Sequence, residues 1–130
     1  MTTPFLCVFL AFLLIYLPRL FVLVAQTRRP EGFDNRHPRD QQSRLEGWGR
    51  RANAAHANAF EAFAPFAAAV LVAHLAGADA RWSSILAIVF VVSRAIYPVL
   101  YMTNLDKLRT TVWSIGFLAV AGLFVLRWVV

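Results

Sequence analysis

Residues 4–25, PFLCVFLAFLLIYLPRLFVLVA, decide the fold, and their only charged residue is Arg19. An α-helix of this length is about 33 Å long, which is enough to cross the hydrocarbon core of a bilayer. The run is longer than the apolar core of a secretory signal peptide, about 7–15 residues, and no positively charged side chain precedes it. We therefore predict a transmembrane helix that remains in the mature protein.

The composition of the whole chain agrees with a membrane location. Of its 130 residues, 59% are hydrophobic and 15% are charged, whereas soluble domains average roughly 45–50% and about 25%. A chain this short cannot bury so much apolar surface in a soluble globule. The net charge of +6 favours anionic lipid, because the sequence lacks the interleaved aromatic and basic stripes that bind nucleic acid. We predict a lipid bilayer as partner and no nucleic acid.

Further apolar segments follow the first one. Three of them are predicted to span the membrane: residues 52–78, 82–102 and 111–130. Residues 26–51 are rich in Pro, Gly, Asn, Asp and Gln, which is typical of a solvated loop. A short surface helix over 40–51 is possible there, but Gly47 and Gly49 disfavour it. The predicted fold is an all-α membrane protein, a four-transmembrane-helix bundle in one domain over residues 1–130.

The loop charges predict how the bundle is oriented. Residues 27–51 hold seven Arg, and the third loop holds Lys107 and Arg109, whereas Arg81 is the only basic residue of the short second loop. By the positive-inside rule the first and third loops are cytoplasmic. Both termini are therefore predicted to lie outside.

Two charged residues inside the predicted spans call for a partner or a task, because charges are costly in a membrane. Glu61 lies about 15 Å into the second helix from its cytoplasmic end, and Arg94 lies about 12 Å into the third. Since the depths match, we predict that Glu61 and Arg94 form an ion pair inside the bundle.

Other polar residues follow the same two helices. On the second helix the polar residues that share a face are Arg51, Asn58 and Glu61, and on the third helix they are Arg94, Tyr97 and Tyr101. Residues seven apart differ by about 20° around a helix, so each set forms a stripe. The two stripes converge toward the cytoplasmic end, where a cavity would suit a small anionic, polar ligand.

The remaining chemically versatile residues are given structural interpretations. His56 points away from Asn58 and is predicted to lie at a helix end or interface, and Cys7 is predicted to be a buried hydrophobe. Arg19 is expected to snorkel or to pair at a kink near Pro18. No HExxH-like spacing of His and acidic residues occurs, so no metal site is predicted.

Residues 51–66, RANAAHANAFEAFAPF, carry a resemblance to a known family. The pattern Ala55-His56-x-Asn58-x-x-Glu61-x-x-x-Pro65-Phe66 resembles the opening of the second helix in the MAPEG family, the membrane-associated proteins in eicosanoid and glutathione metabolism, in a bacterial-type member. The third span is similar as well, with Arg94 followed by two tyrosines and then by Leu108-Arg109.

The resemblance implies a homotrimer that binds glutathione between neighbouring subunits near the cytoplasmic side, in a bacterial inner membrane. It implies that Arg109 stabilises the thiolate, because a nearby guanidinium favours ionised sulfur, and that Tyr101 shares the catalytic role. The residues implied to bind or brace the cofactor are Arg51, Asn58, Glu61, Arg94 and Tyr97.

Three functions remain open from the sequence. The first is a glutathione-dependent transferase or peroxidase acting on lipophilic electrophiles or hydroperoxides. The second is a non-catalytic lipid- or partner-binding protein of the same fold. The third is an unrelated small membrane subunit whose polar residues only fix helix packing.

One residue departs from the pattern of the family. In its enzymes an arginine commonly stands four residues before the Asn, and Ala54 takes that place here.

Overall fold

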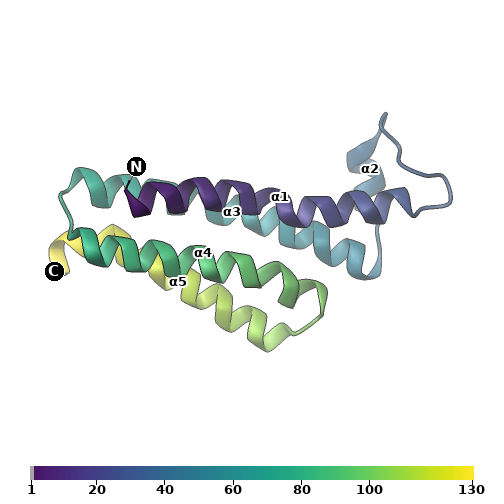
Figure 1. Ribbon diagram of the computed structural model, residues 1–130. Helices are drawn as coiled ribbons and strands as arrows, with labels where there is room; N and C mark the ends of the chain where they lie inside the picture. Colours follow the sequence, from purple (N-terminus) through teal and green to yellow (C-terminus); the bar gives the residue numbers. More distant parts are fainter. Residues whose placement is uncertain (1) are drawn as a thin grey trace.

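The computed structural model describes residues 2–130, which are α-helical with no strand in that range. The helices, in chain order, are α1 (Thr3–Thr27), α2 (Pro38–Ser43), α3 (Gly47–Leu75), α4 (Ala80–Met102) and α5 (Asp106–Val129) (Figure 1). Four of them, all except the short α2, are long and apolar enough to cross a membrane. The prediction of an all-α fold with four such helices is confirmed.

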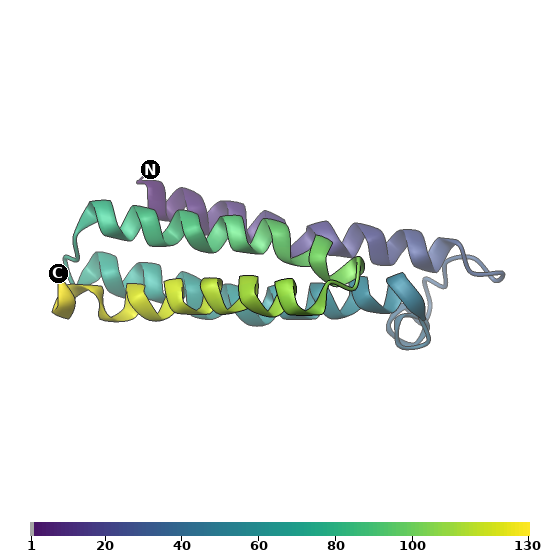
Figure 2. The same ribbon diagram turned by 90° about the horizontal axis from the view of Figure 1, so that it is seen from below.

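The four long helices run side by side as a bundle. α1 packs mainly on α3 and α4 packs mainly on α5, while α3 also contacts both α4 and α5. Within the described chain α1 and α5 make no contact, so they occupy opposite corners. Both ends of the chain lie at one end of the bundle, and the segment with α2 lies at the other (Figures 1 and 2). There α1 and α3 extend beyond the turn between α4 and α5.

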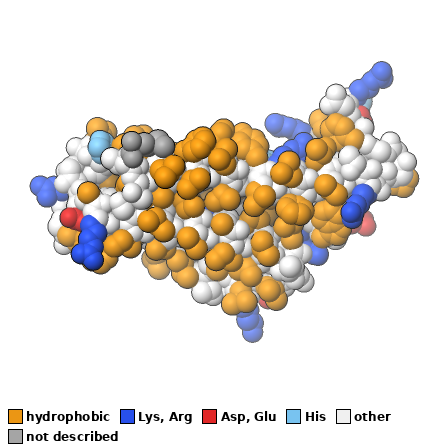
Figure 3. Space-filling model, in the orientation of Figure 1, with side chains coloured by type: hydrophobic (Ala, Val, Ile, Leu, Met, Phe, Trp, Pro, Cys, Tyr) orange, Lys and Arg blue, Asp and Glu red, His pale blue; other side chains and the backbone are white. Residues whose placement is uncertain are grey.

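The outer surface of the bundle is apolar, as a lipid environment requires. Figure 3 shows hydrophobic side chains over much of the middle of the visible face. Exposed side chains include Phe9 and Leu20 of α1 at 51% and 60%, and Phe117 and Leu118 of α5 at 57% and 65%. Soluble monomers rarely expose continuous apolar surface of this extent. The chain is an integral membrane protein.

Small residues bring the helices close together in the core. Buried alanines come from four helices: Ala11, Ala69, Ala73, Ala87 and Ala119. Between them the rings of Phe66 and Phe90 stack with centroids 3.9 Å apart. Cys7 is 4% exposed in the same cluster and is a buried hydrophobe, as predicted.

The start of α3 differs from the prediction. The helix begins at Gly47, five residues before the start predicted for the second span, and no continuous helix covers 40–51 because residues 44–46 are not helical. A β-carbon on Gly49 would lie 2.7 Å from Cβ of Ala25, so glycine allows α1 and α3 to touch at this point. Gly47 has a φ of +56°, a left-handed conformation in which the chain turns into the helix.

Two buried glutamines hold the segment between α1 and α3 against the end of α1. The side-chain amide of Gln26 donates to Oε1 of Gln41 and to the Pro38 carbonyl, each at 3.1 Å. Gln41 in turn donates to the Gly32 carbonyl at 2.7 Å. Arg19 reaches the same cluster and donates to Oε1 of Gln26 at 3.2 Å, so it pairs rather than remaining alone in the span.

Candidate functional site

The centre of the site is a contact between Asn58 of α3 and Arg94 of α4. Nη1 of Arg94 donates to Oδ1 of Asn58 at 3.1 Å. Arg94 is only 7% exposed, and its Nη2 is buried without a hydrogen-bond partner among the described residues. A cation this deeply buried needs nearly all its donors satisfied. Nη2 is therefore an unpaired donor enclosed within the bundle.

Glu61 does not take the place predicted for it. Residues 2–130 contain no ion pair of Glu61 within 4.0 Å, so the predicted pairing with Arg94 was wrong. Asn58 lies three residues earlier on the same helix and turns toward α4, whereas Glu61 is exposed. A neutral amide therefore faces Arg94, and the carboxylate of Glu61 points away from Arg94 and lies beside the larger cavity.

The predicted residues of α4 and α5 form a continuous row of guanidinium groups and phenol rings. The guanidinium carbon of Arg94 lies 4.7 Å from the ring centre of Tyr97, and the rings of Tyr97 and Tyr101 meet edge to face at 5.7 Å. Arg109 then lies 4.4 Å above the ring of Tyr101. Cation–π attraction acts within about 6 Å, so each arginine is held by the tyrosine beside it.

Two cavities flank this row. The larger, of about 440 Å³, has Asn58, Glu61 and Arg94 at its polar part. Its apolar walls come from α3, α4 and α5: Ala62, Pro65, Phe90, Trp113, Phe117, Val120, Ala121 and Phe124. The smaller, of about 240 Å³, is lined by Tyr97, Tyr101, Arg109, Thr110 and Trp113. Trp113 lines both, so one indole separates the Asn58–Arg94 contact from Arg109.

Arg51 is bound differently from its neighbours in the predicted stripe. Its Nε donates to the Met102 carbonyl at 3.0 Å. Met102 is the last residue of α4, and a cation at a helix C-terminus satisfies unpaired carbonyl groups there. Arg51 therefore ties the start of α3 to the end of α4, next to the row that runs from Arg94 to Arg109.

Comparison with known protein families matches residues 3–127 to the MAPEG family. The chain belongs to the MAPEG family. No curated protein of known function matches it, and no solved structure does. Membership, together with four apolar helices, makes this a membrane protein of a family whose members generally bind glutathione.

His56, within the motif that resembles the MAPEG family, has a structural place. Its Nδ1 lies 2.8 Å from the Ile15 carbonyl of α1. Because a carbonyl only accepts, Nδ1 carries the proton. His56 is the interface histidine that the sequence predicts.

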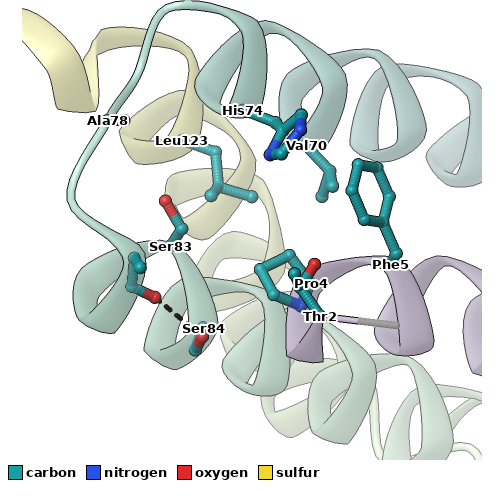
Figure 4. Close-up of a pocket in the computed structure, with 10 residues that line it drawn as sticks. Thr2, Pro4, Phe5, Val70, His74, Ala78, Ser83, Ser84 and Leu123 are labelled. Atoms are coloured by element: carbon teal, nitrogen blue, oxygen red, sulfur yellow. Dashed lines mark hydrogen bonds between the residues drawn. The ribbon is translucent and has the colours of Figure 1, made fainter.

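The opposite end of this MAPEG chain has a small cavity of about 110 Å³. Figure 4 shows His74 of α3 and Phe5 of α1 on one side of it and Ser83 and Ser84 of α4 on another. His74 packs edge to face on Phe5 with ring centres 4.9 Å apart. Residues 2–130 contain no group of three or more His, Cys, Asp or Glu that could hold a metal ion.

Sequence reasoning missed the residues that shape the larger cavity. Trp113 of α5 stacks on Phe117 with ring centres 5.4 Å apart, and it lines both cavities. Gly116, between them in sequence, lies directly against Ser93 and Arg94. The spacing of Trp113, Gly116 and Phe117 places them on one face of α5. The sequence does not show that this face packs against α4, so their role could be recognised only from the pairing of the two helices.

Proposed function

We propose that this MAPEG protein is a glutathione-dependent transferase or peroxidase that acts on lipophilic electrophiles or hydroperoxides. The observation that carries the proposal is the larger cavity, which joins a polar part at Asn58, Glu61 and Arg94 to aromatic walls on α5. Trp113 and Phe117 on these walls are 40% and 57% exposed. An apolar substrate reaches such walls from the bilayer, while a polar cofactor binds at the charged part.

The residues present fit glutathione in charge. Glutathione carries two carboxylates and one ammonium group besides its thiol, and its thiolate is the nucleophile or reductant that it supplies when bound. Arg51 and Arg109 offer cations for the carboxylates, and Glu61 offers an anion for the ammonium group. Asn58 and Arg94 line the polar part of the larger cavity, and together with Tyr97 they form the group that braces the site.

Arg109 and Tyr101 are the proposed catalytic residues. The guanidinium of Arg109 lies on the ring of Tyr101 at 4.4 Å and beside the smaller cavity. A fixed positive charge there lowers the free energy of an ionised sulfur. The Tyr101 hydroxyl is a hydrogen-bond donor on the same wall, and it supports the same charge.

We further propose that the site is completed by a second protomer of a homotrimer. The support is Glu61, an exposed carboxylate inside a membrane span, which no described cation neutralises within 4.0 Å. Such a charge is costly when it faces lipid, so a neighbouring subunit or a bound ligand covers it. The seven Arg of residues 27–51 support a cytoplasmic loop, with both termini outside, in a bacterial inner membrane.

Calorimetry of detergent-purified protein with glutathione tests the binding site. We expect saturable binding that Asn58→Ala and Arg51→Ala each weaken at least about tenfold. Asn53→Ala, five residues before Asn58 on α3, is the matched control and retains the affinity of the unaltered protein. Absence of binding at millimolar glutathione would contradict the proposal.

Turnover of a chloronitrobenzene and of a fatty-acid hydroperoxide tests the enzymatic role. Arg109→Ala is expected to abolish thiol transfer while native mass spectrometry still shows the trimer. An unchanged rate in Arg109→Ala would show that Arg109 is not the thiolate-stabilising residue.

Ala54, at the place of an arginine common in the family's enzymes, favours the second candidate function, a non-catalytic lipid- or partner-binding protein. That function predicts glutathione-independent binding of lipid and no turnover.

A further inference from the structure

Gly116 of α5 lies directly against the guanidinium of Arg94. A β-carbon at this position would be 2.6 Å from Oγ of Ser93, 3.1 Å from Nη2 of Arg94 and 3.5 Å from its Nε. The first of these distances is shorter than two such atoms tolerate, and the second is tight. Only glycine therefore lets α5 close over the buried end of Arg94.

Ser93 completes the enclosure from the α4 side. Its hydroxyl donates to the Phe90 carbonyl at 2.7 Å and accepts from Nε of Arg94 at 3.4 Å. The hydroxyl is thus held one turn back on its own helix, between the arginine and Gly116. Ser93 is 4% exposed, so its side chain has little space for another rotamer.

The remaining sides of the guanidinium are also occupied. Asn58 accepts from Nη1 at 3.1 Å, and the rings of Phe90 and Tyr97 lie 5.6 and 4.7 Å from the guanidinium carbon. The clash of an added methyl group at Gly116 is relieved in one of three ways: the Ser93 hydroxyl rotates away, the Arg94 guanidinium moves, or α5 shifts outward. The last two alter the polar part of the larger cavity.

We propose that Gly116 is a positioning residue: because it has no side chain, Ser93 and the Arg94 guanidinium keep their places beneath α5, and the ligand affinity of the larger cavity is set without Gly116 touching the ligand. The part that concerns affinity rests on the proposed binding of glutathione. The part that concerns position rests only on the contacts between α4 and α5. Displacements of about 1 Å in a binding site change rates and affinities by up to about a hundredfold.

Gly122 provides a matched control on the same helix. A β-carbon there would lie 3.2 Å from Cδ1 of Leu86, the flexible end of an apolar side chain outside the larger cavity. Gly116→Ala is expected to raise the glutathione dissociation constant at least about tenfold, whereas Gly122→Ala leaves it within about twofold. Adding Ser93→Ala to Gly116→Ala removes the tightest contact and is expected to restore most of the affinity, while Ser93→Ala alone changes it little.

Nitrogen NMR of arginine-labelled protein separates the two parts of the proposal. The Nε–H resonance of Arg94 is assigned by its loss in Arg94→Lys, and no ligand is needed. We expect Gly116→Ala to shift this resonance and Gly122→Ala to leave it in place. An unmoved resonance overturns the positioning role. A shifted resonance in a protein that never binds glutathione overturns the proposed function instead and upholds the positioning role.

Calorimetry has an equally decisive outcome. If the unaltered protein binds glutathione and Gly116→Ala binds it equally well, the proposed control of affinity is wrong. If Ser93→Ala fails to restore the affinity of Gly116→Ala, the loss does not arise from the contact between these two residues, and the role of Ser93 is overturned.

Discussion

Arg94 donates to the Asn58 amide at 3.1 Å while the carboxylate of Glu61, on the next turn of the same helix, stays at the surface. The bundle thus buries a cation with a neutral partner and aromatic rings rather than with a second charge. Burying both members of an ion pair costs desolvation twice. The arrangement leaves Nη2 of Arg94 buried without a hydrogen-bond partner among the described residues, and it places the Glu61 carboxylate beside the larger cavity.

Asn58→Leu is expected to destabilise the protein because it leaves a second donor of Arg94 buried without an acceptor. The loss in the free energy of unfolding should be about 1–3 kcal/mol, measured by denaturant unfolding in detergent. Asn53→Leu, on the same helix, is the control for the change of side chain alone. Equal losses in the two variants would show that the contact between Asn58 and Arg94 contributes nothing.

His56→Phe removes the hydrogen bond to the Ile15 carbonyl and keeps an aromatic ring between α1 and α3. We expect a loss of about 0.5–1.5 kcal/mol in the free energy of unfolding. Denaturant unfolding in detergent measures this loss. An unchanged free energy of unfolding in His56→Phe would show that the hydrogen bond to the Ile15 carbonyl contributes nothing.

The apolar runs of the sequence predicted the bundle well because the bilayer imposes length and hydropathy on every span. Helical periodicity also placed Arg94, Tyr97 and Tyr101 on one face, and the structure joins them in one row. Depth alone could not decide whether Asn58 or Glu61 faces Arg94. That choice depends on which side of α3 packs on α4, and the two residues differ by about 60° around the helix.

The start of α3 and the walls of the larger cavity escaped prediction for a related reason. Gly49 has a low helix propensity, but its contact with α1 outweighs that preference. Trp113 and Phe117 resemble any lipid-facing aromatic residues in a sequence. They become site residues only because α5 pairs with α4, which is a property of the packing.

Gln41→Ala is expected to loosen the segment between α1 and α3. The side chain of Gln41 is 1% exposed, and it joins the Gln26 amide to the Gly32 carbonyl. Its loss leaves buried polar groups unpaired, so trypsin should cleave at the arginines of this segment several times faster. Ser43→Ala, which alters only an exposed local hydrogen bond, is the control. Equal cleavage rates would mean that the glutamines do not hold the segment.

Asp34 makes the same segment sensitive to acid. Backbone N–H groups of His37 and Arg36 donate to its carboxylate at 3.1 and 2.9 Å, and these bonds hold the pKa of Asp34 below its usual value. Since the folded-state pKa is lowered, the stabilisation is complete above the unfolded-state value of about 3.9. It is lost as the pH falls through the lower folded-state value.

Hydrogen exchange at the amides of Arg36 and His37 measures this effect. Protection should decline as the pH is lowered through the folded-state pKa of Asp34, after correction for the intrinsic exchange rate. Asp34→Asn should weaken protection at neutral pH, whereas Asp40→Asn, which loses only an exposed ion pair with Arg44, should not. Protection that is the same in Asp34→Asn and in the unaltered protein would contradict the role of this carboxylate.

Gly49→Ala is expected to force α1 and α3 apart, because its β-carbon would lie 2.7 Å from that of Ala25. Overpacking of this kind costs about 1–3 kcal/mol, read from denaturant unfolding in detergent. Ala25→Gly alone should cost about 1 kcal/mol, since glycine weakens a helix interior. In the double variant the methyl group is merely exchanged between the helices, so the space is restored. The loss in the free energy of unfolding of the double variant should therefore be smaller than the sum of the two single losses, by at least about 1 kcal/mol. Strict additivity would show that the contact between Gly49 and Ala25 does not set the spacing of α1 and α3.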